Sequence, residues 1–170
     1  VVLPGKDPFI SMEYIEGEDL THKAQQKEGK HFSWQEIEPY ILSLCDGLAY
    51  AHDHGMVHRD IKPQNLMITT EGELKLADFG IATPLQEENE GSDIQVSRAG
   101  TPVYWSPQQA QGMNPAPTDD IYSLGVSLFQ LLVGEPPFKG LNEPALTYQH
   151  INEEPPHPLE KLKELGGEGK

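Results

Sequence analysis

Residues 57–68, with the sequence VHRDIKPQNLMI, bring together side chains that can move protons and balance charge. Within eight positions the chain holds an imidazole, two cations, a carboxylate and an amide, on His58, Arg59, Lys62, Asp60 and Asn65. The stretch is too polar for a strand of the core, and apolar residues frame it too closely for a solvated loop. Its composition therefore indicates a site at which a chemical step takes place.

Three further motifs follow this stretch in order. Asn65 comes five positions after Asp60, which is the H-R-D-x-x-x-x-N spacing, and the tripeptide DFG begins at Asp78, eighteen positions after Asp60. The segments GTPVYWSPQQ, from residue 100, and DIYSLG, from Asp120, come next. The tripeptide HRD or the tripeptide DFG alone would be a weak signal. Together the motifs resemble the C-terminal lobe of a protein kinase over roughly residues 9–155, and GTPVYWSPQQ is most similar to bacterial serine/threonine kinases.

The resemblance implies a serine/threonine protein kinase that transfers the γ-phosphate of ATP to a Ser or Thr hydroxyl of a protein substrate. Asp60 would orient that hydroxyl, and Lys62 would neutralise the phosphoryl group in transfer. Thr101 would link the substrate-docking loop to both residues. Asn65 and Asp78 would supply oxygen ligands to Mg²⁺. The implied cofactors are therefore ATP and Mg²⁺.

The resemblance also implies supporting and regulatory roles. His58 and Phe79 would stack in the internal spine, Gly80 would complete the DFG motif, and Asp120 would tether the backbone of the catalytic loop. Arg59 would face the acidic loop at residues 84–100, where a phosphate could pair with it; a surface salt bridge is the rival interpretation. Among possible phosphate acceptors we favour Ser97 over Thr83 and Ser92, and Asp93 is an alternative that would supply a fixed charge.

Nucleotide recognition is expected in the stretch MEYIEG and in the residues that follow it. The resemblance makes Met12 the gatekeeper and assigns the adenine edge to the backbone of Glu13 and Ile15. Asp19 would meet the ribose. The apolar floor under the base would consist of Leu20 and Met67.

The local pattern predicts the elements that position these residues. A strand is expected over residues 9–14, with a turn at Glu16-Gly17. A helix should follow, begun by a Ser33/Glu36 capping box or with Pro39 in its first turn, and ended near Gly55. Alternation predicts a β-hairpin over residues 66–76 that turns at 71–72. A buried helix over 120–134 and a short helix over 143–151 complete the expected fold.

Composition narrows the class of partner. The net charge of −15 argues against nucleic acid or an anionic membrane. No apolar run reaches the length of a membrane span, and no signal peptide is evident, so we expect a cytoplasmic location, with the possibility that a longer parent protein is membrane-anchored. Cys45 lies in an apolar helical stretch and is expected to be a buried, inert thiol.

The expected fold is mainly α with a small β-hairpin, the C-lobe of the α+β kinase fold, with the N-terminal lobe largely absent. Residues 1–16 would be the last strand of that lobe and the hinge, 17–155 the C-lobe, and 156–170 a flexible polar tail. The 170 residues hold no Gly-rich phosphate loop and no V-A-I-K lysine, so we expect the chain alone to be inactive. Gln108 stands where the family has a glutamate. The alternative function is a non-catalytic interaction module derived from a kinase.

Overall fold

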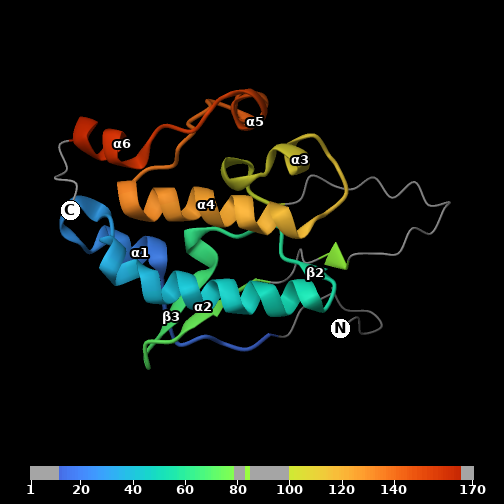
Figure 1. Cartoon of the computed structure of the whole chain (residues 1–170). Helices are drawn as coiled ribbons and strands as arrows, with labels where there is room; N and C mark the ends of the chain where they lie inside the picture. The colour runs from blue at the N-terminus through green and yellow to red at the C-terminus, as the bar shows by residue number, and fades with distance from the viewer. Residues whose placement is uncertain (1–11, 79–82, 85–99, 166–170) are drawn as a thin grey trace, which may run out of the picture.

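The computed structural model describes residues 12–78, 83–84 and 100–165, and two long helices form its centre. These are α2 (Trp34–Asp53) and α4 (Pro117–Val133), which lie one above the other in Figure 1. In the same view a small sheet lies below α2, and α5 and α6 lie above α4. The expectations for Phe79, Gly80, Ser97 and most of the acidic loop fall outside the described residues.

Helix α2 forms as the sequence predicts. Its inward positions recur at threes and fours, and all are buried: Ile37, Ile41, Leu44, Leu48 and Ala51. The capping box is present, because the Glu36 carboxylate accepts hydrogen bonds of 2.9 Å from the Ser33 N–H and from the Ser33 hydroxyl. Pro39 therefore lies within the helix and not at its start. After Asp53 the chain turns at Gly55, whose φ of +72° is a left-handed conformation that suits glycine.

The sheet confirms the hairpin and corrects the strand that was expected before it. Strands β3 (Leu66–Thr69) and β4 (Leu74–Leu76) pair antiparallel, and β1 (Gly17–Asp19) pairs with the other edge of β3. The expected strand over 9–14 is wrong where it can be seen, because residues 12–16 are not in a strand. Gly17 begins the real strand, and a Cβ there would lie 2.1 Å from the Ile68 carbonyl oxygen. The position of β1 thus depends on close backbone approach to β3. The alternation of apolar and polar residues along one strand carries no information about that contact.

A second, two-stranded sheet leads into the polar stretch at 58–65. Strand β2 (Met56–Val57) pairs antiparallel with β5 (Thr83–Pro84). The short 3₁₀ helix η2 (Pro63–Asn65) follows, and β3 begins at Leu66. The polar stretch is therefore held between a strand on one side and a helical turn on the other.

Helix α4 is the predicted buried helix, but it begins three residues earlier than Asp120. Pro117 occupies its first position, where a missing N–H costs nothing, and the Asp119 carboxylate accepts a 3.0 Å bond from the Ala116 N–H. Asp119 and Asp120 therefore lie in the first turn, near the positive end of the helix dipole. The helix ends at Gly134, which has a φ of +90°.

The remaining helices are short. They are α1 (Leu20–Gln25), η1 (Glu28–Lys30), η4 (Pro102–Tyr104), α3 (Pro107–Ala110), α5 (Glu143–Asn152) and α6 (Pro158–Glu164). The short helix expected over 143–151 is α5. The expectation of a structureless tail from residue 156 is wrong over α6. Pro158 can start a helix, and Lys161 pairs with Glu164 on α6 and with Glu135 beyond α4.

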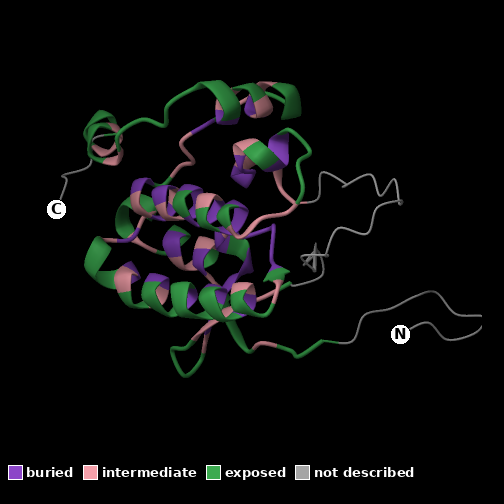
Figure 2. Cartoon of the chain, turned by 45° about the vertical axis from the view of Figure 1, so that its right-hand side comes forward, coloured by how far each residue is buried: buried purple, intermediate pink, exposed green. Residues whose placement is uncertain are grey.

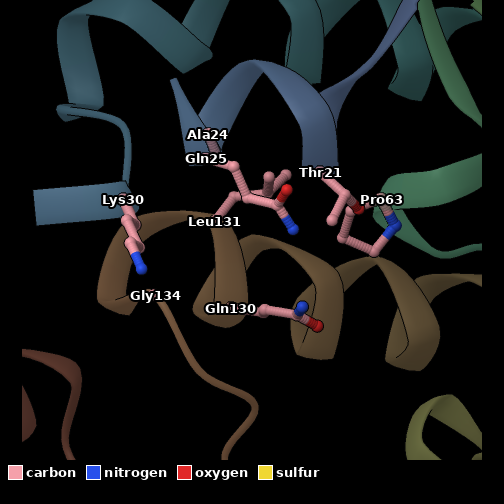
Figure 3. Close-up of a pocket in the computed structure, with 8 residues that line it drawn as sticks. All are labelled: Thr21, Ala24, Gln25, Lys30, Pro63, Gln130, Leu131 and Gly134. Atoms are coloured by element: carbon pink, nitrogen blue, oxygen red, sulfur yellow. The ribbon is translucent and has the colours of Figure 1, made fainter. Parts of the chain in front are cut away.

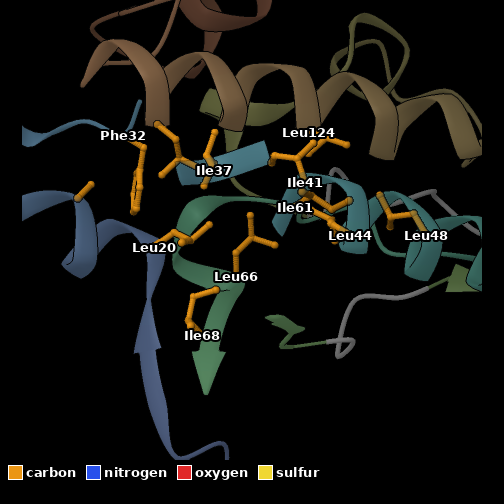
Figure 4. Packing of buried hydrophobic residues seen from close by; sticks show 12 residues of the cluster. Leu20, Phe32, Ile37, Ile41, Leu44, Leu48, Ile61, Leu66, Ile68 and Leu124 are labelled. Carbon is orange, nitrogen blue, oxygen red and sulfur yellow. The ribbon is translucent and has the colours of Figure 1, made fainter. Parts of the chain in front are cut away.

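The apolar core lies between α2, α4 and β3. Figure 4 shows buried apolar side chains of this core meeting between the three elements, and Figure 2 shows that the buried residues concentrate there. Leu20, Ile37, Ile61 and Leu66 have no exposed surface, and burying such a side chain contributes about 1.5–3 kcal/mol relative to exposure. Cys45 is exposed, which corrects the expected buried thiol. It follows Leu44 by one position, which turns its side chain away from the core.

Candidate active site

The polar stretch forms a buried loop beneath the start of α4. His58 is 1% exposed, Asp60 4% and Asn65 7%. Burial of a carboxylate is unfavourable unless it is paired and hydrogen-bonded. The contacts of Asp60 therefore determine what the loop can do.

The Asp60 carboxylate is held by two side chains that the sequence analysis singled out. The Lys62 ammonium donates to Asp60 Oδ2 at 2.6 Å and to Thr101 Oγ1 at 2.8 Å. Thr101 donates to Asp60 Oδ1 from its backbone N–H and from its hydroxyl, both at 2.9 Å. An acid, a cation and a hydroxyl thus converge although Thr101 is 41 residues from Asp60. This is the arrangement that the resemblance implied.

Buried side chains also hold the backbone on either side of Asp60. The Asp120 carboxylate accepts from the His58 N–H at 2.9 Å and from the Arg59 N–H at 2.7 Å. The Asn65 amide donates to the Asp60 carbonyl oxygen at 2.8 Å. Asp120 has no exposed surface, so its charge is balanced by these hydrogen bonds and by the dipole of α4. The tethering role expected for Asp120 has its geometric basis here.

His58 is held in one neutral tautomer. Its Nδ1 accepts from the Asp60 N–H at 3.2 Å, so its Nε2 carries the proton and donates to the Ala77 carbonyl at 3.2 Å. Burial lowers the pKa of the His58 imidazole, and nearby carboxylates oppose this effect only in part. A neutral ring fits the supporting role that was expected of His58.

Arg59 occupies an unusual backbone position. Its φ is +67°, a region that L-residues other than Asn and Asp seldom adopt, and the residue is 4% exposed. Burial lowers the pKa of the guanidinium, while the charges of Asp119 and Asp120 raise it. Arg59 therefore lies among buried carboxylates. Its expected pairing with the acidic loop involves residues outside the described part of the chain.

The backbone brings Asn65 close to Asp78, the two residues that were expected to hold a cation. The Ala77 N–H donates to the Asn65 carbonyl oxygen at 2.8 Å, which brings Asp78 next to Asn65. The Asn65 amide nitrogen is engaged with Asp60, which leaves its amide oxygen for a cation, and Asp78 is exposed. In the described residues no group of three or more His, Cys, Asp or Glu side chains could hold a metal. Magnesium needs only one or two protein oxygens beside water and phosphate, so the donor set fits Mg²⁺.

The residues expected to bind the nucleotide fall into two groups. Asp19 and Met67 are direct partners across the β1–β3 pair, and Met67 is half-buried, so they lie side by side on one surface. Leu20 has no exposed surface. It is a core residue, which corrects its expected place on the floor of the site.

Among the hinge residues, Glu13 reaches the neighbourhood of that group, because its partner Lys75 lies directly across the β3–β4 pair from Met67. Met12 is 67% exposed, and Glu13 is exposed and pairs with Lys75 at 2.5 Å. Ile15 is half-buried and is not in a strand. The backbone roles expected for Glu13 and Ile15 stay predictions.

A pocket of about 420 Å³ lies between α1, η2 and the end of α4. Figure 3 shows the eight residues that line it: Thr21, Ala24, Gln25, Lys30, Pro63, Gln130, Leu131 and Gly134. Its wall includes Pro63, the residue after Lys62. Tyr104, three residues after Thr101, donates to the side chain of Gln130 at 2.7 Å. The pocket therefore adjoins both segments that hold the Asp60 cluster.

Sequence reasoning missed three residues of this region. His52 Nε2 lies 2.8 Å from Asp120 Oδ2, although no motif assigns His52 a role. Ser127 donates to the Ile61 carbonyl at 3.3 Å, and Gln109 donates to the Arg59 carbonyl at 3.0 Å. No spacing rule marks these residues, because their partners are 50 to 68 positions away. Gln108, which the sequence analysis did single out, is exposed.

Comparison with known proteins agrees with this geometry. A model of the protein kinase domain family matches residues 3–164. The chain is 39% identical over 157 residues to the serine/threonine-protein kinase PknB of Mycolicibacterium smegmatis, and the matched region covers 91% of this chain and 24% of that protein. It is 36% identical over 167 residues to PknB of Mycobacterium tuberculosis, covering 96% and 26%. It is 35% identical over 158 residues to a probable PknB of Corynebacterium glutamicum, covering 93% and 24%.

The chain therefore belongs to the protein kinase family, as the motifs predicted. It spans about a quarter of the length of these curated relatives. None of the helices in the described part of the chain has the length and apolar character needed to cross a bilayer.

Proposed function

We propose that this chain carries the catalytic loop of a serine/threonine protein kinase, which transfers the γ-phosphate of ATP to a protein hydroxyl. The observation that supports this most strongly is the convergence of Lys62 and Thr101 on the buried Asp60 carboxylate. The PknB relatives are named as serine/threonine kinases, and a lysine two residues after the aspartate is the pattern for that acceptor type.

Each residue has a distinct task in this proposal. Asp60 accepts a hydrogen bond from the acceptor hydroxyl, orients its oxygen and takes its proton as the phosphoryl group is transferred. Lys62, now shared between Asp60 and Thr101, offsets the charge of the transferring phosphoryl oxygens. Thr101 keeps the docking segment in register with Asp60. Most of the catalytic effect then comes from positioning and charge.

Asn65 and Asp78 would hold Mg²⁺ in this proposal. The ion supplies neutralising charge to the phosphate oxygens when it is bound. Asp78 is exposed and therefore open to an arriving nucleotide, and Asp19 and Met67 lie opposite one another on the β1–β3 pair.

The substrate is proposed to be a polypeptide. The pocket beside Pro63 and Gln130 can receive a side chain near the acceptor residue, because its walls continue into both segments that hold Asp60. The net charge of −15 disfavours nucleic acid. Because ATP is the phosphate donor, we place this domain in the cytoplasm.

A direct test compares the 170-residue chain with a lobe-supplemented chain, in which a protein-kinase N-terminal lobe replaces residues 1–11 and is fused directly to Met12. That lobe supplies the Gly-rich loop and the lysine which these residues do not contain. With Mg²⁺, labelled ATP and a generic basic protein, the lobe-supplemented chain should label Ser and Thr. The 170-residue chain should show no useful transfer.

One result would contradict the proposal: a lobe-supplemented chain that binds ATP but transfers no phosphate, which would favour the non-catalytic module. Clear transfer by the 170-residue chain would support the kinase activity and would overturn only the expectation that the Gly-rich loop and its lysine are required.

A further inference from the structure

The backbone around Asp60 is held at four consecutive polar atoms, each by one buried side chain. The Arg59 N–H is bound by Asp120, the Asp60 N–H by His58, and the Asp60 carbonyl by Asn65. The fourth atom is the Arg59 carbonyl oxygen, which accepts a 3.0 Å bond from the side chain of Gln109. The motifs imply roles for the first three partners. Gln109 is the last residue of the segment GTPVYWSPQQ, but the sequence analysis assigns it no role.

The Arg59 peptide needs such a partner more than its neighbours do. Arg59 has a φ of +67°, so its carbonyl is fixed in an unfavourable conformation. The oxygen also lies against Gly100, where a Cβ would approach it to 2.6 Å. The segment that carries Thr101 therefore does two things for this carbonyl: Gly100 leaves space for it, and Gln109 donates a hydrogen bond to it.

Gln109 is itself rigidly placed. Its side chain is 1% exposed, and its N–H donates to Ser106 Oγ at 2.9 Å. Ser106 Oγ in turn donates to Asp119 Oδ1 at 2.5 Å, in the first turn of α4. The next residue of that turn, Asp120, holds the Arg59 N–H. Both backbone polar atoms of Arg59 are thus linked by hydrogen bonds to the start of α4, the N–H directly and the carbonyl through Gln109 and Ser106.

We propose that Gln109 is a positioning residue that fixes the Arg59 peptide and thereby aims the Asp60 carboxylate at the acceptor hydroxyl. The expected effect on catalysis rests on the proposed kinase function, whereas the hydrogen bonds that hold the Arg59 peptide do not. The docking segment then holds Asp60 in two ways. Thr101 bonds the carboxylate, and Gln109 bonds the peptide that precedes it.

The first test needs no enzymatic activity. Amide hydrogen exchange is measured by NMR on the ¹⁵N-labelled 170-residue chain, for the wild type, Gln109→Met and Gln108→Met. Methionine keeps the length of the side chain and removes the donor. Gln108 is the matched control, because it is the adjacent glutamine of the same helix and is exposed.

We expect Gln109→Met to accelerate exchange of the Arg59 and Asp60 amides at least tenfold, with no comparable change at Leu48 in α2. Gln108→Met should change neither. Uniform acceleration throughout the chain would show a merely structural role and overturn the proposal, as would unchanged exchange at both loop amides. If Gln109→Met does not fold, Gln109→Glu keeps the shape of the side chain and places an oxygen against the Arg59 carbonyl at neutral pH, with the same expectations.

The second test uses the lobe-supplemented chain. Gln109→Met should lower kcat about 10- to 100-fold, because small displacements of a reacting group have effects of this size. KM for ATP should stay within twofold, and Gln108→Met should match the wild type. An unchanged kcat in an active fusion would overturn the catalytic consequence. If the wild-type fusion is inactive, the proposed function fails, while the exchange measurement still decides whether Gln109 holds the loop.

Discussion

Asp60 and its neighbours show how a buried carboxylate stays usable as a reactive group. Lys62 and Thr101 satisfy both carboxylate oxygens, so the charge is compensated in the absence of substrate. Lys62 keeps 21% of its side chain exposed. In the proposed function the ammonium would turn to an incoming phosphoryl group, and an acceptor hydroxyl would take its place at Asp60.

At the same scale, buried histidines should make stability depend on pH. His150 is 4% exposed, its Nδ1 lies 2.9 Å from the Tyr122 hydroxyl, and burial lowers its pKa. A histidine with a lowered folded pKa binds its proton more readily in the unfolded chain, so stability falls as pH drops below about 6.5. His58 acts in the same direction.

We predict that His150→Phe loses less unfolding free energy between pH 7 and pH 5.5 than the wild type does. One such group changes that energy by at most about 1.4 kcal/mol per pH unit. Urea unfolding at a series of pH values measures the difference. His22→Phe should act in the opposite sense, because the Asp19 partner raises the pKa of His22. Parallel curves for the wild type and His150→Phe would refute the assignment.

Residue identity could be predicted from sequence where a motif spacing fixes it. Asp60, Lys62 and Thr101 meet as expected, because the family resemblance implies both their spacing and their partners. Asn65 was expected only as a ligand of Mg²⁺, and its hydrogen bond to the Asp60 carbonyl was not foreseen. Gln109 could not be predicted, since its function depends on a carbonyl 50 positions away.

At the scale of elements, helix α2 is the best test of local sequence signals. Its apolar period, its Ser33/Glu36 cap and Gly55 at its end all agree, so its boundaries were predictable. Strand β1 had no such signal, because its position depends on contact with β3. Helix α6 was missed because its composition is polar, and its pairing with Glu135 is tertiary.

Removing the cap should weaken the whole C-lobe through α2. We predict that Ser33→Ala lowers the free energy of unfolding by about 1 kcal/mol, a typical cost for loss of an N-cap side chain. The matched control is Ser43→Ala, an exposed serine in the middle of the same helix. Chemical denaturation of both variants makes the comparison. Equal effects at the two positions would show that the cap contributes nothing specific.

For the whole molecule, the excess of acidic residues lowers the stability of the folded state. The chain carries 27 acidic and 12 Lys or Arg residues, and like charges destabilise a compact state until salt screens them. The pairs among the described residues are mostly exposed, such as Lys75 with Glu13, and such pairs contribute little.

Stability should therefore rise with ionic strength. We predict that the melting temperature increases between about 10 mM and 300 mM NaCl, over which the Debye length shortens from about 30 Å to well below 10 Å. Differential scanning calorimetry gives the result, and an equal concentration of an uncharged osmolyte controls for general solvent effects. A melting temperature that falls with added salt would mean that specific ion pairs outweigh the net repulsion.

We propose that the phosphoryl transfer site of the whole molecule is built around Asp60. The most direct measurement is the steady-state rate of phosphate transfer by the lobe-supplemented chain carrying Asp60→Asn, with Asp53→Asn as the control at an exposed aspartate of α2. We predict that Asp60→Asn lowers kcat by about 10²- to 10⁴-fold, with KM for ATP little changed, and that Asp53→Asn behaves as the wild type. An Asp60→Asn variant that keeps the wild-type kcat would contradict the account.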